Sequence, residues 1–257
     1  MCELFGLSAD HLLNGDELPL AEFRRRGGAL ADNPDGWGLA WREGGEFHLE
    51  KEPLPASAST RFAALIETLR SDLVVGHVRK ARFPPVNTLA NTHPFLRPCC
   101  GRGWVFAHNG LVPDIVALEA ANGGRVCLPE GETDSELAFC HLLSHATRHF
   151  RDAGAGWPAA LAAVSELIAR HGMFNFLLSD GEHLIAYGHD RLHYLETEGV
   201  ALVATEPLGG DSGWTAFAPG ELRIWRAGAR VGRVATHPPA PNNSGEASTM
   251  WVGLQAD

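Results

Sequence analysis

The chain opens with Met-Cys-Glu-Leu-Phe-Gly-Leu-Ser over residues 1–8, so that Cys2 directly precedes a run with the composition of a short buried strand. Removal of Met1, which a small second residue usually permits, would leave Cys2 with a free α-amine. One residue would then carry a thiol nucleophile and, in an amine with a pKa of about 7.7–8.0, its own base. A cysteine here is also common as a small strand residue, so other segments must decide its role.

A second segment, Phe-Ala-His-Asn-Gly over residues 106–110, follows an apolar run and ends in a dipeptide that favours tight turns. The plainer interpretation is a hairpin corner. The chemical interpretation is an oxyanion hole, in which the side-chain amide of Asn109 and the backbone N–H of Gly110 donate to one developing negative charge.

Two charged residues match the two ends of an amino acid. Arg79 stands at the end of a predicted buried strand, where a guanidinium either is solvated or binds a carboxylate through two hydrogen bonds. Asp134 lies in the first turn of a predicted helix, where a carboxylate either complements the helix dipole or binds an ammonium group. Together they would hold the α-carboxylate and the α-amine of one ligand.

The hydrophobic pattern predicts many short strands and few helices. The helices are predicted at 56–69, 133–150 and 159–170, and the second opens with the capping-box pattern Thr133-x-x-Glu136. The elements do not alternate as in a doubly wound sheet, so the order favours a layered α+β architecture. The predicted strands are at 3–8, 37–41, 73–78, 104–107, 174–178, 184–187, 192–195, 201–204 and 222–225.

The composition excludes several classes of partner. The 257 residues carry a formal net charge of -10, from 31 acidic and 21 basic residues, so we expect no nucleic acid to bind. No apolar run is long enough to span a membrane, and the start lacks the features of a signal peptide. We expect a single domain over residues 2–257, in which 237–248, rich in Pro, Asn and Ser, forms a loop or loose tail.

The five cysteines are an odd number, and without a secretory signal they predict a free thiol, no disulfide framework and a cytoplasmic location. Cys99 and Cys100 are adjacent in a predicted turn and lack the Cys-x-x-Cys spacing of a zinc knuckle. Three of the 13 histidines, at positions 141, 145 and 149, share one helix face and could in principle bind a metal. Helix-surface histidines are more often solvated, so we expect no metal and no cofactor.

Taken together, these segments resemble the class II glutamine amidotransferases, whose fold is a four-layer αββα sandwich of the N-terminal-nucleophile hydrolase type. Segments 35–38, Asp-Gly-Trp-Gly, and 174–181 are similar to the stand-alone bacterial branch called YafJ. The motifs that carry the resemblance follow in the family's order: Cys2, Arg26-Gly27, Gly-His-Val-Arg at 76–79, Asn-Thr-His-Pro at 91–94, His-Asn-Gly at 108–110 and Glu-Thr-Asp-Ser-Glu at 132–136.

The resemblance implies a role for each residue singled out above. Cys2 would be the nucleophile, and Asn109 with Gly110 would form the oxyanion hole. Arg79 would bind the α-carboxylate of glutamine, and Asp134 its α-amine.

Two further residues would support the site: Arg26, by holding the N-terminal segment, and His93, as a structural or pocket-lining residue and not a base. The chain departs from the family pattern after Arg79, where it reads Lys-Ala-Arg-Phe-Pro over 80–84 and lacks the Thr and Gly that help cradle glutamine. A larger γ-glutamyl compound is therefore a second candidate substrate.

We expect hydrolysis of the γ-glutamyl amide of glutamine through a Cys2 thioester, giving glutamate and ammonia. The alternative within the same fold is a γ-glutamyl hydrolase that acts on a γ-glutamyl peptide or conjugate. A third reading is a non-catalytic binding subunit, which retention of Met1 would favour. The glutaminase-type domain takes up the whole chain, so we expect any synthase to be a separate protein. The sequence leaves the ammonia acceptor and the oligomeric state open, a homo-oligomer included.

Overall fold

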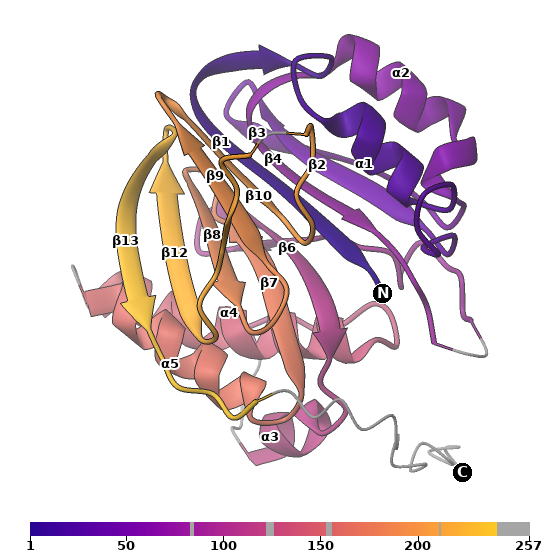
Figure 1. The fold of residues 1–257 in the computed structure, drawn as a ribbon. Helices are drawn as coiled ribbons and strands as arrows, with labels where there is room; N and C mark the ends of the chain where they lie inside the picture. The colour runs from indigo at the N-terminus through magenta and orange to yellow at the C-terminus, as the bar shows by residue number, and fades with distance from the viewer. Residues whose placement is uncertain (83–84, 122–125, 153–155, 211, 241–257) are drawn as a thin grey trace.

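The protein folds around two antiparallel sheets that pack face to face (Figure 1). The structure is a computed structural model and describes residues 1–257 except 83–84, 122–125, 153–155, 211 and 241–257. In its described part, the seven-stranded sheet has the order β11 (Thr215–Ala216), β9 (His193–Thr197), β10 (Val200–Ala204), β1 (Glu3–Asn14), β4 (Arg70–Val78), β2 (Trp37–Glu43) and β3 (Glu46–Glu52). The six-stranded sheet has the order β13 (Ala229–Ala235), β12 (Glu221–Arg226), β8 (His183–Gly188), β7 (Met173–Ser179), β6 (Arg102–Leu111) and β5 (Phe95–Cys99).

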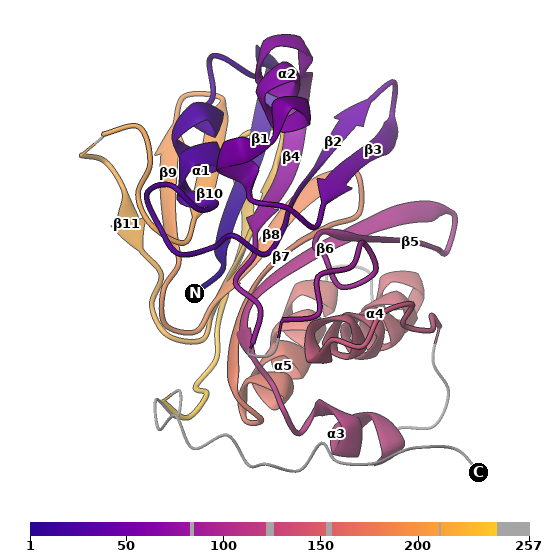
Figure 2. The ribbon, with the colours of Figure 1, turned by 90° about the vertical axis from the view of Figure 1, so that its right-hand side faces the viewer.

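Helices cover the outer face of each sheet (Figures 1 and 2). The 3-10 helix η1 (Ala56–Ala58) and the helices α1 (Leu20–Arg26) and α2 (Thr60–Thr68) lie over the seven-stranded sheet. Over the six-stranded sheet lie α4 (Asp134–Asp152) and α5 (Trp157–Ala169), and α3 (Ile115–Ala121) packs against α4. The layers are therefore αββα, and the predicted α+β sandwich is confirmed.

The central strands of the two sheets, such as β4, β6, β7 and β8, are buried on both faces, which explains their short, nearly continuous apolar runs. On β6, Val105 and Ala107 belong to the core between the two sheets, whereas Trp104 and Phe106 belong to the core under the helices. Side chains alternate along a strand, so Asn109 has the same orientation as Val105 and Ala107 and faces the space between the sheets. The side chain of Leu4, near the start of β1, faces the same space, since Leu4 belongs to the same core.

The helix predicted at 56–69 is divided. Its first turn is η1, and the helix proper begins after Ser59, whose hydroxyl accepts a hydrogen bond from the backbone nitrogen of Phe62 at 3.0 Å. Serine is a preferred N-cap residue, and its extended backbone interrupts the apolar period that the sequence carries through this point. The helices predicted at 133–150 and 159–170 are present as α4 and α5.

The sequence did not predict the edge strands. β3 is half-exposed and carries three Glu in seven residues, and β13 is mostly exposed, so neither has the apolar run that marks a buried strand. β5, another edge strand, contains Pro98, and proline lowers strand propensity. The helices α1 and α3 were not predicted either, because each spans seven residues, too few for a clear helical period. The first strand extends to Asn14, beyond the predicted end at residue 8, after a register shift between Ser8 and Leu13.

The predictions of a C-terminal loop and of no membrane span can be compared only with the described part of the chain. Most of the predicted loop at 237–248 lies outside the described residues, and the part within them, 237–240, has no regular structure. None of the helices that the structure describes combines the length and the apolar character needed to cross a membrane.

Candidate active site

Cys2 lies at the start of β1, against the residue that follows Arg79. Strand pairing puts Glu3 opposite Val78, so the chain after β4 passes beside Cys2. The backbone nitrogen of Lys80 donates to the Cys2 Sγ at 3.2 Å, and the Lys80 carbonyl oxygen lies 3.4 Å from the same sulfur. Burial raises the pKa of the Cys2 thiol, and the Lys80 N–H and the Arg79 charge oppose that rise. Met1 precedes Cys2 here, so the nitrogen of Cys2 is an amide.

The structure brings Asn109 to Cys2. The Asn109 Nδ2 donates to the Cys2 carbonyl oxygen at 2.5 Å and to the Thr205 Oγ1 at 3.2 Å, so both of its N–H groups have acceptors. Gly110 follows with a φ of 145°. A Cβ atom at this position would lie 2.0 Å from the Met173 carbonyl oxygen, so no other residue fits.

A buried network around Asn109 involves residues that the sequence did not single out. Thr205, directly after β10, accepts a second hydrogen bond at its Oγ1, from the Leu4 backbone nitrogen at 2.9 Å. Asn175 on β7 donates from Nδ2 to the Asn109 carbonyl oxygen at 3.1 Å and to the Asp190 Oδ1 at 2.6 Å. The signal for Asn175 was present, because it is a lone amide inside the apolar run Phe-Asn-Phe-Leu-Leu. Thr205 merely follows an apolar strand, a position that singles out no role.

Arg79 is buried, with 8% of its surface exposed, and is held by one residue before β2 and one in the segment after β4. Its Nη1 donates to the Asn87 Oδ1 at 2.9 Å and to the Asp35 carbonyl oxygen at 3.3 Å. The Asp35 carboxylate accepts from the Ala81 backbone nitrogen at 2.8 Å, which fixes the chain on the far side of Lys80. Burial lowers the pKa of Arg79, and the nearby Cys2 and Asp35 raise it.

Asp134 is the first residue of α4, and its hydrogen bonds connect this helix to the end of β6. Its Oδ2 accepts from the Val112 backbone nitrogen at 2.8 Å, and its Oδ1 from the Ser135 backbone nitrogen at 2.9 Å. No hydrogen bond within the described chain joins Asp134 to Arg79, so any shared ligand would have to bridge them.

His108 connects the start of α4 with the neighbour of Asn109. Its Nε2 lies 3.0 Å from the Met173 carbonyl oxygen, and its Nδ1 lies 2.9 Å from the Ser135 Oγ. A carbonyl oxygen can only accept, so Nε2 carries the proton and Nδ1 accepts from the serine hydroxyl. Burial lowers the pKa of His108, and the Asp134 charge opposes this, so the ring is neutral.

Arg26 contacts the residue after Cys2. Its Nη1 lies 3.3 Å from the Glu3 Oε2, and its Nη2 donates to the Glu22 Oε1 at 2.9 Å and to the Pro207 carbonyl oxygen at 3.0 Å. Burial raises the pKa of Glu3, and the Arg26 charge opposes that rise. Arg26 thus joins the start of β1 to α1 and to the segment after β10.

His93 is buried and paired with a second histidine. Its Nδ1 lies 3.0 Å from the His77 Nε2, and its ring meets the Phe95 ring edge-on. Burial lowers the pKa of His77 to about 3 and that of His93 well below its ordinary value, so both rings are neutral.

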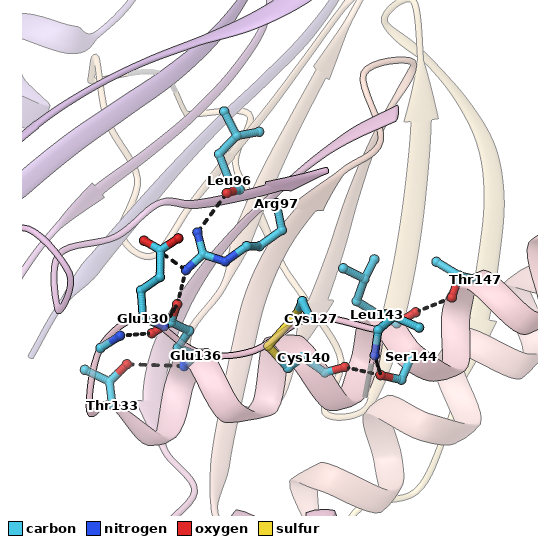
Figure 3. Close-up of a disulfide and its surroundings, with 12 residues drawn as sticks. Leu96, Arg97, Cys127, Glu130, Thr133, Glu136, Cys140, Leu143, Ser144 and Thr147 are labelled. Carbon is cyan, nitrogen blue, oxygen red and sulfur yellow. Dashed lines mark hydrogen bonds and ion pairs between the residues drawn. A yellow bond between two sulfur atoms is a disulfide. The ribbon is translucent and has the colours of Figure 1, made fainter. Parts of the chain in front are cut away.

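The loop before Asp134 is held by a buried carboxylate (Figure 3). The side chain of Glu136 accepts from the backbone nitrogens of Glu130 at 2.9 Å and Gly131 at 2.7 Å, and it pairs with Arg97. The predicted capping box is therefore half right. The Thr133 hydroxyl accepts from the Glu136 backbone nitrogen at 3.2 Å, but the Glu136 side chain serves the loop and not the Thr133 nitrogen.

Two expectations about cysteine and histidine are wrong. Cys127 in this loop and Cys140 on α4 form a disulfide, with Cα atoms 5.5 Å apart (Figure 3), so the odd cysteine count did not exclude one. The prediction of a cytoplasmic location loses this part of its support. His141 is fully buried, its ring centroid 4.6 Å from that of His145, and is not a solvated surface residue. Across the described residues, no group of three or more His, Cys, Asp or Glu is arranged to hold a metal ion.

Two facing sheets between helical layers, with a cysteine at the head of the first strand, define an N-terminal-nucleophile hydrolase type of sandwich. The phosphoribosylpyrophosphate amidotransferase of Bacillus subtilis has the same fold, with a TM-score of 0.66 at 18% identity, over 91% of this chain and 49% of that one.

Residues 1–199 match the sequence profile of the class II glutamine amidotransferases, and this chain belongs to that family. YafJ of Escherichia coli strain K12, named as a glutamine amidotransferase, is 33% identical over 261 residues, which cover 90% of this chain and 100% of YafJ. The gamma-glutamyl-hercynylcysteine sulfoxide hydrolase of Mycobacterium tuberculosis strain H37Rv is 28% identical over 190 residues, 71% of each chain. Membership of the family implies an enzyme with a glutamine-type substrate.

Proposed function

We propose that this protein, once Met1 is removed, hydrolyses the γ-glutamyl amide of glutamine through a thioester on Cys2. The observation that carries the proposal is the contact between Asn109 and Cys2, because it sets an amide donor beside the residue whose thiol would attack. Removal of Met1 turns the amide nitrogen of Cys2 into an amine, which near neutral pH can accept the thiol proton.

The reaction would run in two steps. The Cys2 amine takes the proton from Sγ, and the thiolate attacks the side-chain carbonyl of glutamine. The tetrahedral oxyanion accepts from the Gly110 N–H and from the Asn109 Nδ2. At Nδ2 it replaces one of the two oxygen atoms that now accept from this amide, those of Cys2 and Thr205. The C–N bond breaks, ammonia leaves with the proton from the Cys2 amine, and water then hydrolyses the thioester to glutamate.

Substrate binding would use the two ends of the amino acid. Arg79 would pair with the α-carboxylate, because its guanidinium is already fixed by Asp35 and Asn87 and lies beside Cys2. Asp134 would pair with the α-ammonium, held in place by the Val112 N–H. We further propose that residues 2–257 form one catalytic domain and that a synthase that uses the ammonia is a separate protein.

A second candidate function is the hydrolysis of a γ-glutamyl peptide or conjugate. Two observations favour it: the similarity to the mycobacterial hydrolase, and the absence of the Thr and Gly that the family pattern places after Arg79. Both candidates share the thioester on Cys2 and differ in the group that leaves.

The test measures glutamate release from glutamine and from γ-glutamyl dipeptides, with the chain freed of Met1. We expect Cys2→Ala to abolish release while the protein remains folded, with Cys99→Ala as the matched control that keeps full turnover. A higher kcat/KM for a γ-glutamyl dipeptide than for glutamine would select the second function. Wild-type turnover in Cys2→Ala would refute both.

A further inference from the structure

The turn between β5 and β6 carries two adjacent cysteines whose sulfur atoms are in contact. The Sγ atoms of Cys99 and Cys100 lie 2.9 Å apart, closer than two non-bonded sulfur atoms ordinarily approach. Cys99 is half-buried and Cys100 is exposed, so a small reagent can reach the pair from solvent. The turn is at the opposite end of β6 from Asn109, roughly 24 Å away at about 3.4 Å per residue.

The conformation of this turn is unfavourable for a cysteine. Cys99 pairs with Arg102, so Cys100 and Gly101 alone form the loop, with φ angles of 59° and 79°. Two-residue loops of this kind favour Asn, Asp or Gly at both positions, because a Cβ atom is strained at positive φ. Nothing lies within 4 Å of the place where a Cβ on Gly101 would stand, so the loop is open on that side. The backbone geometry of the turn therefore does not explain why a cysteine occupies position 100.

We propose that Cys99 and Cys100 form a redox-active dithiol, which a hydroperoxide oxidises to a disulfide between neighbouring residues and a dithiol reductant restores. The Cys100 thiolate attacks the terminal oxygen of the hydroperoxide, the O–O bond breaks, and a sulfenic acid forms, while the other oxygen takes up the thiol proton and leaves as water or as an alcohol. The Cys99 sulfur then attacks the Cys100 sulfur, the S–O bond breaks, and the hydroxyl leaves as water with the proton of the Cys99 thiol. The dithiol loses two electrons and two protons, and the peroxide is reduced to two waters or to a water and an alcohol.

Geometry makes such a bond reversible. Adjacent Cα atoms are about 3.8 Å apart, below the range of about 4.4–6.8 Å found for ordinary disulfides, so the product is strained and easily reduced. The Cα atoms of Cys127 and Cys140 are 5.5 Å apart, within the ordinary range. Cys2 is half-buried, so the oxidant reaches it less readily than the exposed Cys100.

Tryptic digestion of the full chain separates the three groups of cysteines. Cys2 falls in residues 1–24, the adjacent pair in residues 83–102, since the Arg97–Pro98 bond resists trypsin, and the disulfide pair in residues 126–148. The reduced protein is treated with hydrogen peroxide at one equivalent, alkylated and digested. We expect peptide 83–102 to become lighter by two hydrogen atoms and to lose both alkylation sites together. A dithiol reductant should restore both sites.

The variants Cys99→Ser and Cys100→Ser are the matched controls. Each retains one thiol in the same turn and should stop at a sulfenic acid, which is heavier by one oxygen and reacts with dimedone. Two independently alkylated thiols in peptide 83–102 after oxidation would overturn the proposal, as would a cross-link from it to another peptide. The same experiment in a Cys2→Ser background removes the proposed catalytic thiol, so its result does not depend on the proposed function.

Discussion

Replacement of Thr205 by Val tests whether this hydroxyl sets the direction of the Asn109 side chain. The change keeps the shape of the side chain and removes the oxygen that accepts from the Asn109 Nδ2 at 3.2 Å and from the Leu4 nitrogen at 2.9 Å. Thr205 is buried, with 3% of its surface exposed, so no solvent replaces the lost acceptor. The unpaired Leu4 N–H should cost about 1–3 kcal/mol of the free energy of unfolding.

The catalytic effect should be separable from this loss of stability. An oxyanion-hole donor is worth about 2.7–4 kcal/mol in kcat. Thr205→Val leaves the Asn109 amide in place but removes one of the two acceptors that orient it. We expect about a third to a half of the donor's worth to be lost, which lowers kcat roughly tenfold. The KM should stay unchanged, because Thr205 contacts neither Arg79 nor Asp134.

The assay is steady-state glutamate release, run well below the unfolding temperature, with urea unfolding measured in parallel. Thr205→Ser keeps the hydroxyl and is the matched control, so it should retain most of the wild-type kcat. If Thr205→Val and Thr205→Ser turn over at the same rate, Thr205 does not orient Asn109 for the reaction. A large rise in KM with unchanged kcat would contradict the reasoning as well.

Three further predictions concern binding, stability and pH. Arg79→Ala should raise the KM for glutamine roughly tenfold to a hundredfold in steady-state assays, since a hydrogen bond to a charged group is worth about 1.5–3 kcal/mol. An unchanged KM would show that Arg79 does not bind the substrate. Glu136→Gln should cost about 3 kcal/mol in urea unfolding, because it removes the buried carboxylate that faces Arg97 and leaves only the exposed Glu130 as a charge partner. Glu130→Gln removes only that exposed partner and should cost less than about 1 kcal/mol, so equal losses would contradict this. The folded pKa of His77, about 3, is below its unfolded value of about 6.5, so the unfolded chain binds more protons between these values and the free energy of unfolding should fall as the pH drops from 6.5 toward 3. His77→Gln should flatten this pH dependence in urea titrations, and an unchanged slope would show that His77 does not cause it.

The sequence predicted the elements whose burial is uniform. Inner strands such as β4 and β6 are apolar on both faces, so their runs are visible without a structure. The edge strands β3 and β13 are exposed on one side, and their polar composition is that of a loop. Strand order in each sheet depends on pairings between distant segments, such as β1 with β10, which no local pattern encodes.

The candidate site divides in the same way. The short motifs around Cys2, Asn109 and Gly110 singled out these residues, and the structure places Asn109 against Cys2, while their catalytic roles stay a prediction. Thr205 could not be singled out, because its role arises from β10 lying beside β1, where its hydroxyl meets both Leu4 and Asn109. The disulfide between Cys127 and Cys140 was missed for a similar reason, since a cysteine count does not reveal which pairs lie close in space.

The proposed reaction requires Cys2 to act as an N-terminal residue, and a rapidly quenched reaction with glutamine tests this most directly. Peptide mapping of the quenched protein should find a γ-glutamyl group on the peptide that begins at Cys2 and ends at Arg24. No such adduct should form on chains that still carry Met1. A γ-glutamyl group on any other peptide, or full turnover by chains that retain Met1, would contradict the account.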